Sequence, residues 1–321
     1  MTRRALVTGA AGFVGQWLCR TLLDGGWDVV GAGISAEPGR WILGADERRA
    51  VNWALADVRH QADVARVVGY ARPDAIFHLA GVSFIPDAQG DPVLAHEINI
   101  LGAARVVSEV RMRRAAGDID PLVLVIGSAD QYGLGAGPGP VDEATPQLPI
   151  TVYAASKAAQ EIVALEPARR DGVRVVATRS FNHSGPGQPE HFLLPALVAR
   201  AFAIRRGEIP PVLRIGNGDN VRDFLHVRDV VRAYVLLAEK GATGEVYNVA
   251  SGQGRRVRDL AGQVLAAAGV EASIEVDPGL VRRTEVVSLV GNSAKLRAAT
   301  GWRPELACDD IIADLIHAAS H

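Results

Sequence analysis

The chain has 321 residues, of which 48% are hydrophobic and 22% are charged, and its formal net charge is -2. This length and apolar content suffice for one large domain or two domains with a substantial core. The near-neutral charge argues against general binding to nucleic acid, which needs a basic face. The two cysteines have no CxxC spacing and no neighbouring histidine cluster, so we expect neither a metal site nor a disulfide framework.

The ends and the apolar runs of the chain suggest where the protein resides. The N-terminus enters a strand pattern directly, without the apolar region and cleavage site of a signal peptide. No apolar run reaches the roughly 18 residues that a membrane helix needs. We therefore expect a soluble, cytoplasmic protein with no membrane partner.

Strand patterns alternate with helical patterns through the first half of the chain. The expected strands cover residues 5–9, 27–33, 51–57, 74–81, 121–127 and 173–179. Near-continuous apolar strands separated by helices are typical of a parallel sheet covered on both faces. Right-handed crossovers then predict an α/β fold with a doubly wound Rossmann sheet.

The alternation becomes irregular after residue 180. A loop rich in Gly and Pro covers 181–192, and helices are expected at 193–206, 227–237, 257–268 and 309–319. We expect an NAD(P)-binding domain over 1–180 and a smaller C-terminal substrate-binding lobe over 181–216 and 251–321. Residues 217–250, with a strand at 244–251, are expected to return to the first domain.

The segment TGAAGFVG carries three glycines at the first strand-to-helix junction. Glycine there lets the backbone approach a pyrophosphate and lets the N-terminus of the helix face it. The alternative is an ordinary tight turn, which also needs glycine. The predicted cofactor contacts are Gly9, Gly12, Phe13, Val14 and Gly15.

Two further positions bear on the cofactor. Asp57 ends the third expected strand, where it can accept a hydrogen bond from an adenine amino group or cap the next helix; the neighbouring Val58 is included as a contact. The tip of the second strand reads Gly33, Ile34 and Ser35, without the carboxylate that binds the ribose hydroxyls of NAD. The tip thus favours NADP(H) over NAD(H) without excluding either.

The segment TVYAASKAAQEIVAL places Tyr153 and Lys157 four residues apart, on one face of a helix. An ammonium near a phenol lowers the pKa of the phenol, which makes the tyrosine a usable proton donor and acceptor. The spacing alone also fits a surface pair. Ser128, at the end of the fifth strand, could be a nucleophile, a hydrogen-bond donor or a turn residue.

Together, TGAAGFVG, Asp57, HLAG at 78–81, Ser128 and YAASK resemble the extended short-chain dehydrogenase/reductase family. The resemblance covers nearly the whole chain and implies that Tyr153 is the acid/base and that Lys157 orients the cofactor and tunes Tyr153. It implies that Ser128 donates a hydrogen bond to the C4 oxygen of a sugar, while hydride passes between C4 and the nicotinamide. It also implies cofactor contacts by Leu79, Ala80 and Gly81 and a homodimer.

The loop FNHSGPGQ (181–188) and residues 276–305 are similar to those of GDP-4-keto-6-deoxy-mannose reductases within that family. This similarity implies reduction of the C4 keto group of a GDP-sugar. The implied substrate contacts are Ser83, Ser128, Asp130, Asn182, Arg222, Arg282 and Glu285. For Arg222 the alternative is a structural ion pair with Asp223 or Asp229, and for Arg282 a solvated position.

Two histidines outside these motifs are candidates for structural roles. His78 lies inside an apolar strand and is expected to be a satisfied core residue. His183 lies in a Gly/Pro loop with no carboxylate partner in sequence, which favours a role in loop shape.

Three other activities are weighed against the reductase. A 4,6-dehydratase needs an added acid/base pair, and the similar dehydratases carry acidic residues after the strand-end Ser or Thr. This chain has Ala129, which transfers no proton, and Asp130, which is one methylene shorter than glutamate. A 4-epimerase needs only Ser128, Tyr153 and a sugar that can rotate. The intact set of Ser128, Tyr153 and Lys157 argues against a non-catalytic nucleotide sensor.

Overall fold

The computed structural model describes residues 2–35, 40–281 and 286–320. Its largest element is a seven-stranded parallel sheet in the order β10-β6-β5-β4-β1-β2-β3. From β1 the chain adds β2 and β3 on one side and then crosses to add β4, β5 and β6 on the other side. This strand order is typical of a doubly wound Rossmann sheet. The strands are β1 (Arg4–Thr8), β2 (Asp28–Gly33), β3 (Asn52–Leu55), β4 (Ala75–His78), β5 (Leu122–Ser128), β6 (Val175–Ser180) and β10 (Val246–Val249).

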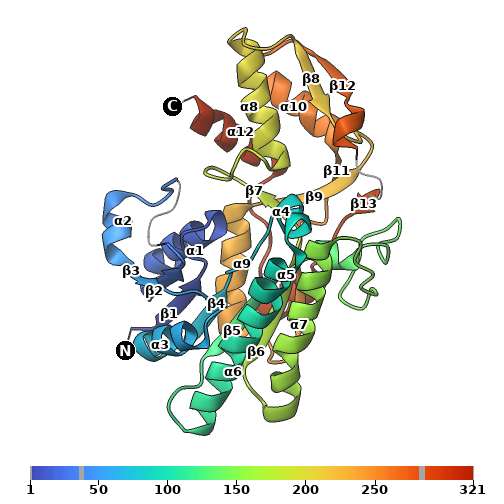
Figure 1. The fold of residues 1–321 in the computed structure, drawn as a ribbon. Coiled ribbons are helices and arrows are strands. Elements are labelled where there is room, and N and C mark those ends of the chain that lie inside the picture. Colours follow the sequence, from blue (N-terminus) through green and yellow to red (C-terminus); the bar gives the residue numbers. More distant parts are fainter. Residues whose placement is uncertain (1, 36–39, 282–285, 321) are drawn as a thin grey trace.

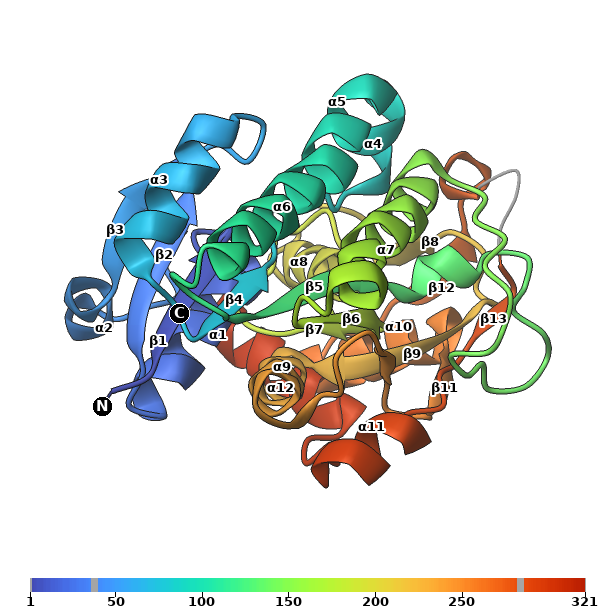
Figure 2. The same cartoon turned by 90° about the horizontal axis from the view of Figure 1, so that it is seen from below.

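Helices cover both faces of this sheet. Figure 2 shows α3 (Gln61–Ala71), α6 (Gly102–Ala115) and α7 (Val152–Asp171) on one side, and α1 (Phe13–Asp24) and α9 (Val227–Lys240) on the other. Successive residues of a strand point to opposite faces, so Leu6 packs in one core and Ala5 and Val7 in the other. This burial on both faces explains the apolar runs that predicted the strands.

A smaller part of the chain lies beyond the carboxyl ends of the sheet, at the top of Figure 1. Helices α8, α10 and α12 enclose its own apolar core. Its strands form a sheet of β11, β9 and β13, to which β7 adds through β9, and a pair, β12-β8. The bounds are β7 (Asn182–Ser184), α8 (Leu193–Arg205), β8 (Val212–Ile215), β9 (Val221–His226), β11 (Gly254–Arg256), α10 (Val257–Ala268), β12 (Ser273–Val276), β13 (Ser288–Leu289) and α12 (Cys308–Ala319).

Residues 217–250 divide between the two parts. α9 packs on the main sheet and β10 pairs with β6 at its edge, whereas β9 pairs with β7, β11 and β13 in the second sheet. The expected return to the main sheet therefore applies to α9 and β10 and not to β9. The reason is that β9 finds its backbone partners in three segments that are distant in sequence.

The remaining elements are short, and most of them connect the larger ones. They are α2 (Ala45–Ala50), α4 (Ile85–Gly90), α5 (Pro92–His96), a π-helical turn (Glu97–Leu101), the 3-10 turns Ala129–Tyr132 and Pro278–Leu280, and α11 (Ala294–Thr300). Within the described ranges, no helix combines the length and apolar character needed to cross a membrane.

Candidate active site

A cleft of about 1260 Å³ separates the carboxyl edge of the main sheet from the smaller part. One wall consists of the turns that follow β1, β2, β4 and β5 together with the start of α7. The other wall consists mainly of residues between 180 and 224, together with Val257, Leu280, Val286 and Leu289. The carboxyl edge of an open parallel sheet is where such folds bind ligands, so this cleft is the candidate active site.

The glycine-rich turn at one end of the cleft is a tight backbone cradle. Gly9 has φ +72°, and a Cβ atom on it would lie 2.8 Å from the backbone N of Ala80. A Cβ atom on Gly15 would overlap the carbonyl oxygen of Gly9 and lie 2.7 Å from Cα of Ala10. Gly12 caps α1 without a side-chain hydrogen bond to the helix. The turn therefore fits an anionic group at the N-terminus of a helix. The five expected contacts between Gly9 and Gly15 all line the cleft.

The loop after β4 forms the next part of the wall, and sequence reasoning missed the residue that holds it. Leu79, Ala80, Gly81 and Ser83 all line the cleft. The buried Asn99 accepts a hydrogen bond from the N–H of Val82 at 2.8 Å and donates to Ser156 Oγ at 2.8 Å. Asn99 thus joins this loop to α7. The sequence signal that could have identified Asn99 is its position between the apolar residues Ile98 and Ile100.

Asp57 and Val58 are not brought to the cleft. Among the described residues neither lines it, and both oxygens of Asp57 accept hydrogen bonds from the Arg59 guanidinium at 2.6–3.1 Å. The structure thus shows Asp57 paired with Arg59, and the expected adenine contact stays a prediction. The capping alternative is wrong, because the N-cap of α3 is His60.

Ser128, Tyr153 and Lys157 converge on the floor of the cleft. Ser128 is the last residue of β5. Tyr153 and Lys157 lie in the first turns of α7, whose N-cap Thr151 accepts from the backbone N of Ala154 at 3.1 Å. Lys157 Nζ donates to the carbonyl oxygen of Ile126 in β5 at 2.9 Å. This bond ties the helix to the strand that carries Ser128.

The electrostatics of this group differ from the sequence expectation. Burial raises the pKa of the Tyr153 hydroxyl, the negative charge of Asp130 raises it further, and a hydrogen bond with Ser128 opposes both. The pKa of Tyr153 is therefore raised, opposite to the direction expected from Lys157, which is not among the causes of the shift. The Lys157 ammonium instead donates to Ile126 and to Gln160 Oε1 at 2.9 Å, and burial lowers its pKa to about 8.

The two residues after Ser128 point in different directions. Asp130 lines the cleft, and its charge acts on Tyr153. Ala129 is 1% exposed and packs in a small apolar cluster with Tyr132 and Phe181. Because Ala129 faces this cluster, its side chain does not reach the cleft. Of the two positions that were compared with acidic residues of the dehydratases, only Asp130 therefore bears on the reaction.

The loop at 181–188 and β9 bring further polar groups to the opposite wall. Asn182, His183 and Arg222 line the cleft. The considered ion pairs of Arg222 are not formed with either aspartate. Asp223 instead accepts backbone N–H groups of residues 251, 252 and 291, and Asp229 pairs with Arg232. Arg282 and Glu285, the other expected contacts, lie outside the described residues.

The two histidines have structural surroundings. The ring of His183 contacts the carbonyl oxygen of Phe181 through Nδ1 at 2.9 Å, and burial lowers its pKa. His78 Nδ1 lies 2.9 Å from Thr8 Oγ1, but its buried Nε2 has no partner among the described residues. His78 is therefore only half satisfied. Burial and the charge of Lys157 lower its pKa to about 3, so the ring stays neutral.

The smaller part contributes cleft residues that carry no sequence motif. Arg200 on α8 and Arg214 on β8 both line the cleft, and Arg200 Nη1 donates to the carbonyl oxygen of Arg214 at 2.6 Å. Phe84 lies with His191 and Phe192 in an aromatic group at the rim, with ring centroids 4.2–5.8 Å apart. Guanidinium and aromatic groups are apt partners for a phosphorylated, ring-containing ligand.

Short-chain dehydrogenases/reductases of the extended type combine a glycine turn, a strand-end serine and a YxxxK helix on one Rossmann sheet. Comparison with known proteins agrees with this class. The family model described as GDP-mannose 4,6 dehydratase matches residues 6–315, and the chain belongs to that family. It is an oxidoreductase of the nucleotide-sugar-modifying branch of the class.

One relative and two solved structures are similar to the chain over nearly its full length. The chain is 34% identical to the GDP-6-deoxy-D-mannose reductase of Pseudomonas aeruginosa, over 95% of this chain and 93% of that protein. The structure of RMD from Pseudomonas aeruginosa complexed with NADPH has a TM-score of 0.79 at 30% identity, covering 98% of both chains. The UDP-glucose 4-epimerase of Thermus thermophilus complexed with NAD has a TM-score of 0.84 at 28% identity, covering 98% of both.

Proposed function

We propose that the protein reduces the C4 keto group of a GDP-4-keto-6-deoxy-hexose with NAD(P)H, giving GDP-rhamnose or its C4 epimer. The observation that carries the proposal is that Ser128, Tyr153 and Lys157 line one cleft beside the glycine cradle. The choice of substrate is supported by the 34% identity to a GDP-6-deoxy-D-mannose reductase.

The cradle of Gly9, Gly12 and Gly15 fits the pyrophosphate of a dinucleotide, because side chains at Gly9 or Gly15 would fill the space close to the backbone. When bound, the reduced nicotinamide supplies a hydride to C4. The described tip residues of β2 carry no carboxylate, and the similar RMD structure contains NADPH. Both facts favour NADP(H) over NAD(H).

Residues of the protein supply the proton that the C4 oxygen takes up during the reduction. The Tyr153 hydroxyl donates its proton to the C4 oxygen as the C–H bond forms, and its raised pKa keeps that proton in place at neutral pH. Ser128 Oγ accepts from the backbone N of Asp130 at 3.2 Å and hydrogen-bonds with Tyr153. When the sugar binds, the Ser128 hydroxyl donates a hydrogen bond to the C4 oxygen instead of to Tyr153. Lys157 orients the ribose of the cofactor.

The opposite wall is proposed to hold the nucleotide. Arg222 binds the diphosphate, for which a guanidinium fork is suited, and Asn182 contacts the phosphate side. Ser83 and Asp130 face the sugar. The roles proposed for Arg282 with the diphosphate and for Glu285 with the nucleotide ribose rest on the family resemblance alone.

The decisive assay mixes purified protein with GDP-4-keto-6-deoxy-mannose and either NADPH or NADH and follows cofactor oxidation. Substrate-dependent oxidation, with a 4-hydroxy GDP-sugar as product, is the expected result. No oxidation with either cofactor would remove the proposed function. The ratio of the two rates measures the cofactor preference.

A 4,6-dehydratase is the second candidate, and Asp130 is the observation that favours it. Its carboxylate lines the cleft near Tyr153, in the region where an added acid/base group would have to act on the sugar. Incubation with GDP-mannose and no reductant separates the candidates. Consumption of GDP-mannose to a 4-keto-6-deoxy product would support the dehydratase, and stable GDP-mannose would leave the reductase.

We also propose a homodimer formed through α6 and α7. The two helices lie side by side (Figure 2) and expose Met112 on α6 and Ile162 on α7 at 51% and 61%. Leu101, at the end of the π-helical turn that precedes α6, is 48% exposed. Exposed apolar side chains on adjacent helices favour an interface. Light scattering should give twice the 34.0 kDa chain mass. A monomer at micromolar concentration would contradict this proposal.

The pKa of Lys157 predicts a pH limit on cofactor binding. Its ammonium has three N–H donors, two of which engage Ile126 and Gln160, so one remains for a ribose hydroxyl. Above its pKa of about 8, Lys157 is neutral and has only two donors. The KM for the cofactor should therefore rise as the pH passes about 8.

Steady-state kinetics across roughly pH 6.5 to 9.5 check this prediction. In Lys157→Met the KM should be high and independent of pH, because the titrating donor is gone. A wild-type KM that stays constant across the range would contradict the assignment of Lys157.

A further inference from the structure

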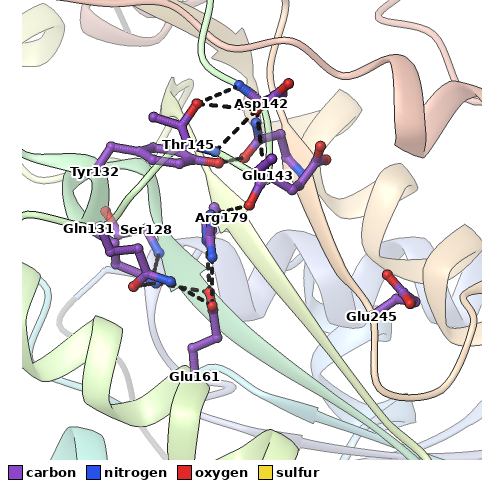
Figure 3. A network of polar contacts seen from close by, with 12 residues as sticks. Ser128, Gln131, Tyr132, Asp142, Glu143, Thr145, Glu161, Arg179 and Glu245 are labelled. Atoms are coloured by element: carbon purple, nitrogen blue, oxygen red, sulfur yellow. Dashed lines mark hydrogen bonds and ion pairs between the residues drawn. The ribbon is translucent and has the colours of Figure 1, made fainter. Parts of the chain in front are cut away.

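A buried ion pair lies behind the floor of the cleft (Figure 3). Glu161 on α7 and Arg179 on β6 have side chains only 7% and 6% exposed. The Glu161 carboxylate accepts from Arg179 Nε at 2.9 Å and from Nη2 at 2.7 Å. It also accepts from the side-chain amides of Gln131 at 2.9 Å and Gln147 at 2.8 Å. Each oxygen thus has two donors, which fills the lone pairs of the carboxylate.

This carboxylate fixes which way the amide of Gln131 points. Because Glu161 accepts only, the NH₂ group of Gln131 must face it, and the carbonyl oxygen must face the other way. That oxygen accepts from the backbone N–H of Ser128 at 2.7 Å. The ion pair therefore reaches the backbone of Ser128 through a single side chain.

Gly127 makes this contact possible. A Cβ atom at position 127 would lie 2.5 Å from Gln131 Oε1 and would overlap the carbonyl oxygen of Thr178 on β6. The absence of a side chain lets the turn fold back on the strand, so Gln131, which is fully buried, can reach Ser128. This accounts for the glycine that precedes the strand-end serine.

The same network joins the two elements that carry the site. Glu161 lies about two turns beyond Tyr153 on α7, and Gln131 lies in the short turn that follows Ser128. Arg179 is held from its other side, because Nη1 donates to the carbonyl oxygen of Glu143 at 3.1 Å. The position of Ser128 relative to Tyr153 is thereby coupled to one ion pair.

We propose that Glu161, Arg179 and Gln131 form a positioning unit that sets Ser128 in register with Tyr153 for the transfer at C4. None of the three lines the cleft within the part of the chain that the structure describes, so they act through Ser128 and not on the substrate. The proposal rests on the proposed function in so far as Ser128 contacts the sugar. It adds three residues that the sequence motifs do not identify.

Stability does not explain this ion pair well. Two charges lose their hydration on burial, and well-packed apolar residues in place of such a pair often leave a protein equally stable. A displacement of about 1 Å in a catalytic group can cost on the order of 100-fold in rate. A unit that orients Ser128 should therefore affect turnover more than stability.

The test compares two variants that break the unit in different places. Gln131→Met removes the acceptor for the Ser128 N–H and leaves the ion pair. Glu161→Met/Arg179→Met removes both charges together, so no lone buried charge remains. In both we expect kcat to fall by at least about tenfold while the KM values change by less than about threefold. The exchange of the Ser128 amide hydrogen should become faster, measured on a peptide over residues 122–132.

The matched control is Glu109→Met/Arg113→Met on α6, where Glu109 is 6% exposed and pairs with Arg113 at 2.6 Å away from the cleft. It should keep the wild-type kcat. If both test variants keep kcat within about twofold of wild type, the proposal is wrong. If the wild-type protein does not turn over the keto sugar, the proposed function fails, and the exchange of the Ser128 amide alone tests the positioning role. Faster exchange in the variants would then support that role, and unchanged exchange would overturn it. Should the double variant not fold, Gln131→Met carries the test.

Discussion

Tyr153→Phe is expected to lower kcat for reduction of the keto sugar by about 10²–10⁴-fold, the usual contribution of a general acid. Phenylalanine keeps the ring and its packing at the start of α7 but removes the only proton that the tyrosine side chain can donate. The affinity for the reduced cofactor should stay within about threefold, because the cradle and Lys157 are unchanged. Stopped-flow reduction and a fluorescence titration with the cofactor measure the two quantities.

Tyr247→Phe is the matched control for this substitution. Tyr247 is 2% exposed on β10, away from the cleft, and its hydroxyl accepts from the backbone N of Ala242 at 3.1 Å. Its loss should cost about 1 kcal/mol of stability and leave kcat unaltered. A Tyr153→Phe enzyme that turns over within about tenfold of wild type would show that another group supplies the proton.

The parts of the site that could be predicted are those encoded by short-range patterns. The turn from Gly9 to Gly15 depends on one strand-to-helix junction, and Tyr153 with Lys157 depends on the pitch of one helix. The main sheet followed in the same way from the alternation of apolar strands and helices. In each case the spacing of residues along the sequence is enough to predict their arrangement in space.

The parts that could not be predicted depend on contacts between distant segments. Lys157 donates to Ile126 across 31 positions, and Asn99 to Ser156 across 57. No local pattern predicts that the Lys157 ammonium donates to Ile126 and Gln160. For the same reason, the sequence did not predict that the pKa of Tyr153 is raised. The burial of Ala129 belongs to the same group, because its apolar neighbours include Phe181 and Ala250, which are distant in sequence.

Burial at the floor of the cleft has a chemical consequence that the motif alone does not give. It raises the pKa of Tyr153 and lowers that of Lys157, so both side chains move toward their neutral forms. A neutral phenol is the form that donates a proton, which suits reduction of a ketone. Oxidation of an alcohol would require the phenolate instead.

Gly15→Ala is expected to weaken cofactor binding by at least about tenfold, although alanine is the better helix former. Alanine in the helix gains up to about 1 kcal/mol over glycine. Its Cβ atom, however, would overlap the carbonyl oxygen of Gly9 and lie 2.7 Å from Cα of Ala10, both backbone atoms that cannot rotate away. Overpacking of this kind costs about 1–3 kcal/mol, so the clash outweighs the propensity and α1 must move away from the turn.

Gly262→Ala tests whether that reasoning separates the two effects. Gly262 lies inside α10, and a Cβ atom there would have no neighbour within 4 Å. Only the gain in helix propensity remains, so the variant should be more stable by about 0.5–1 kcal/mol and should bind the cofactor as wild type does. Calorimetric titration with NADPH and thermal unfolding of both variants give the comparison. Wild-type affinity in Gly15→Ala would contradict the argument that the tight fit of this turn is needed to bind the pyrophosphate.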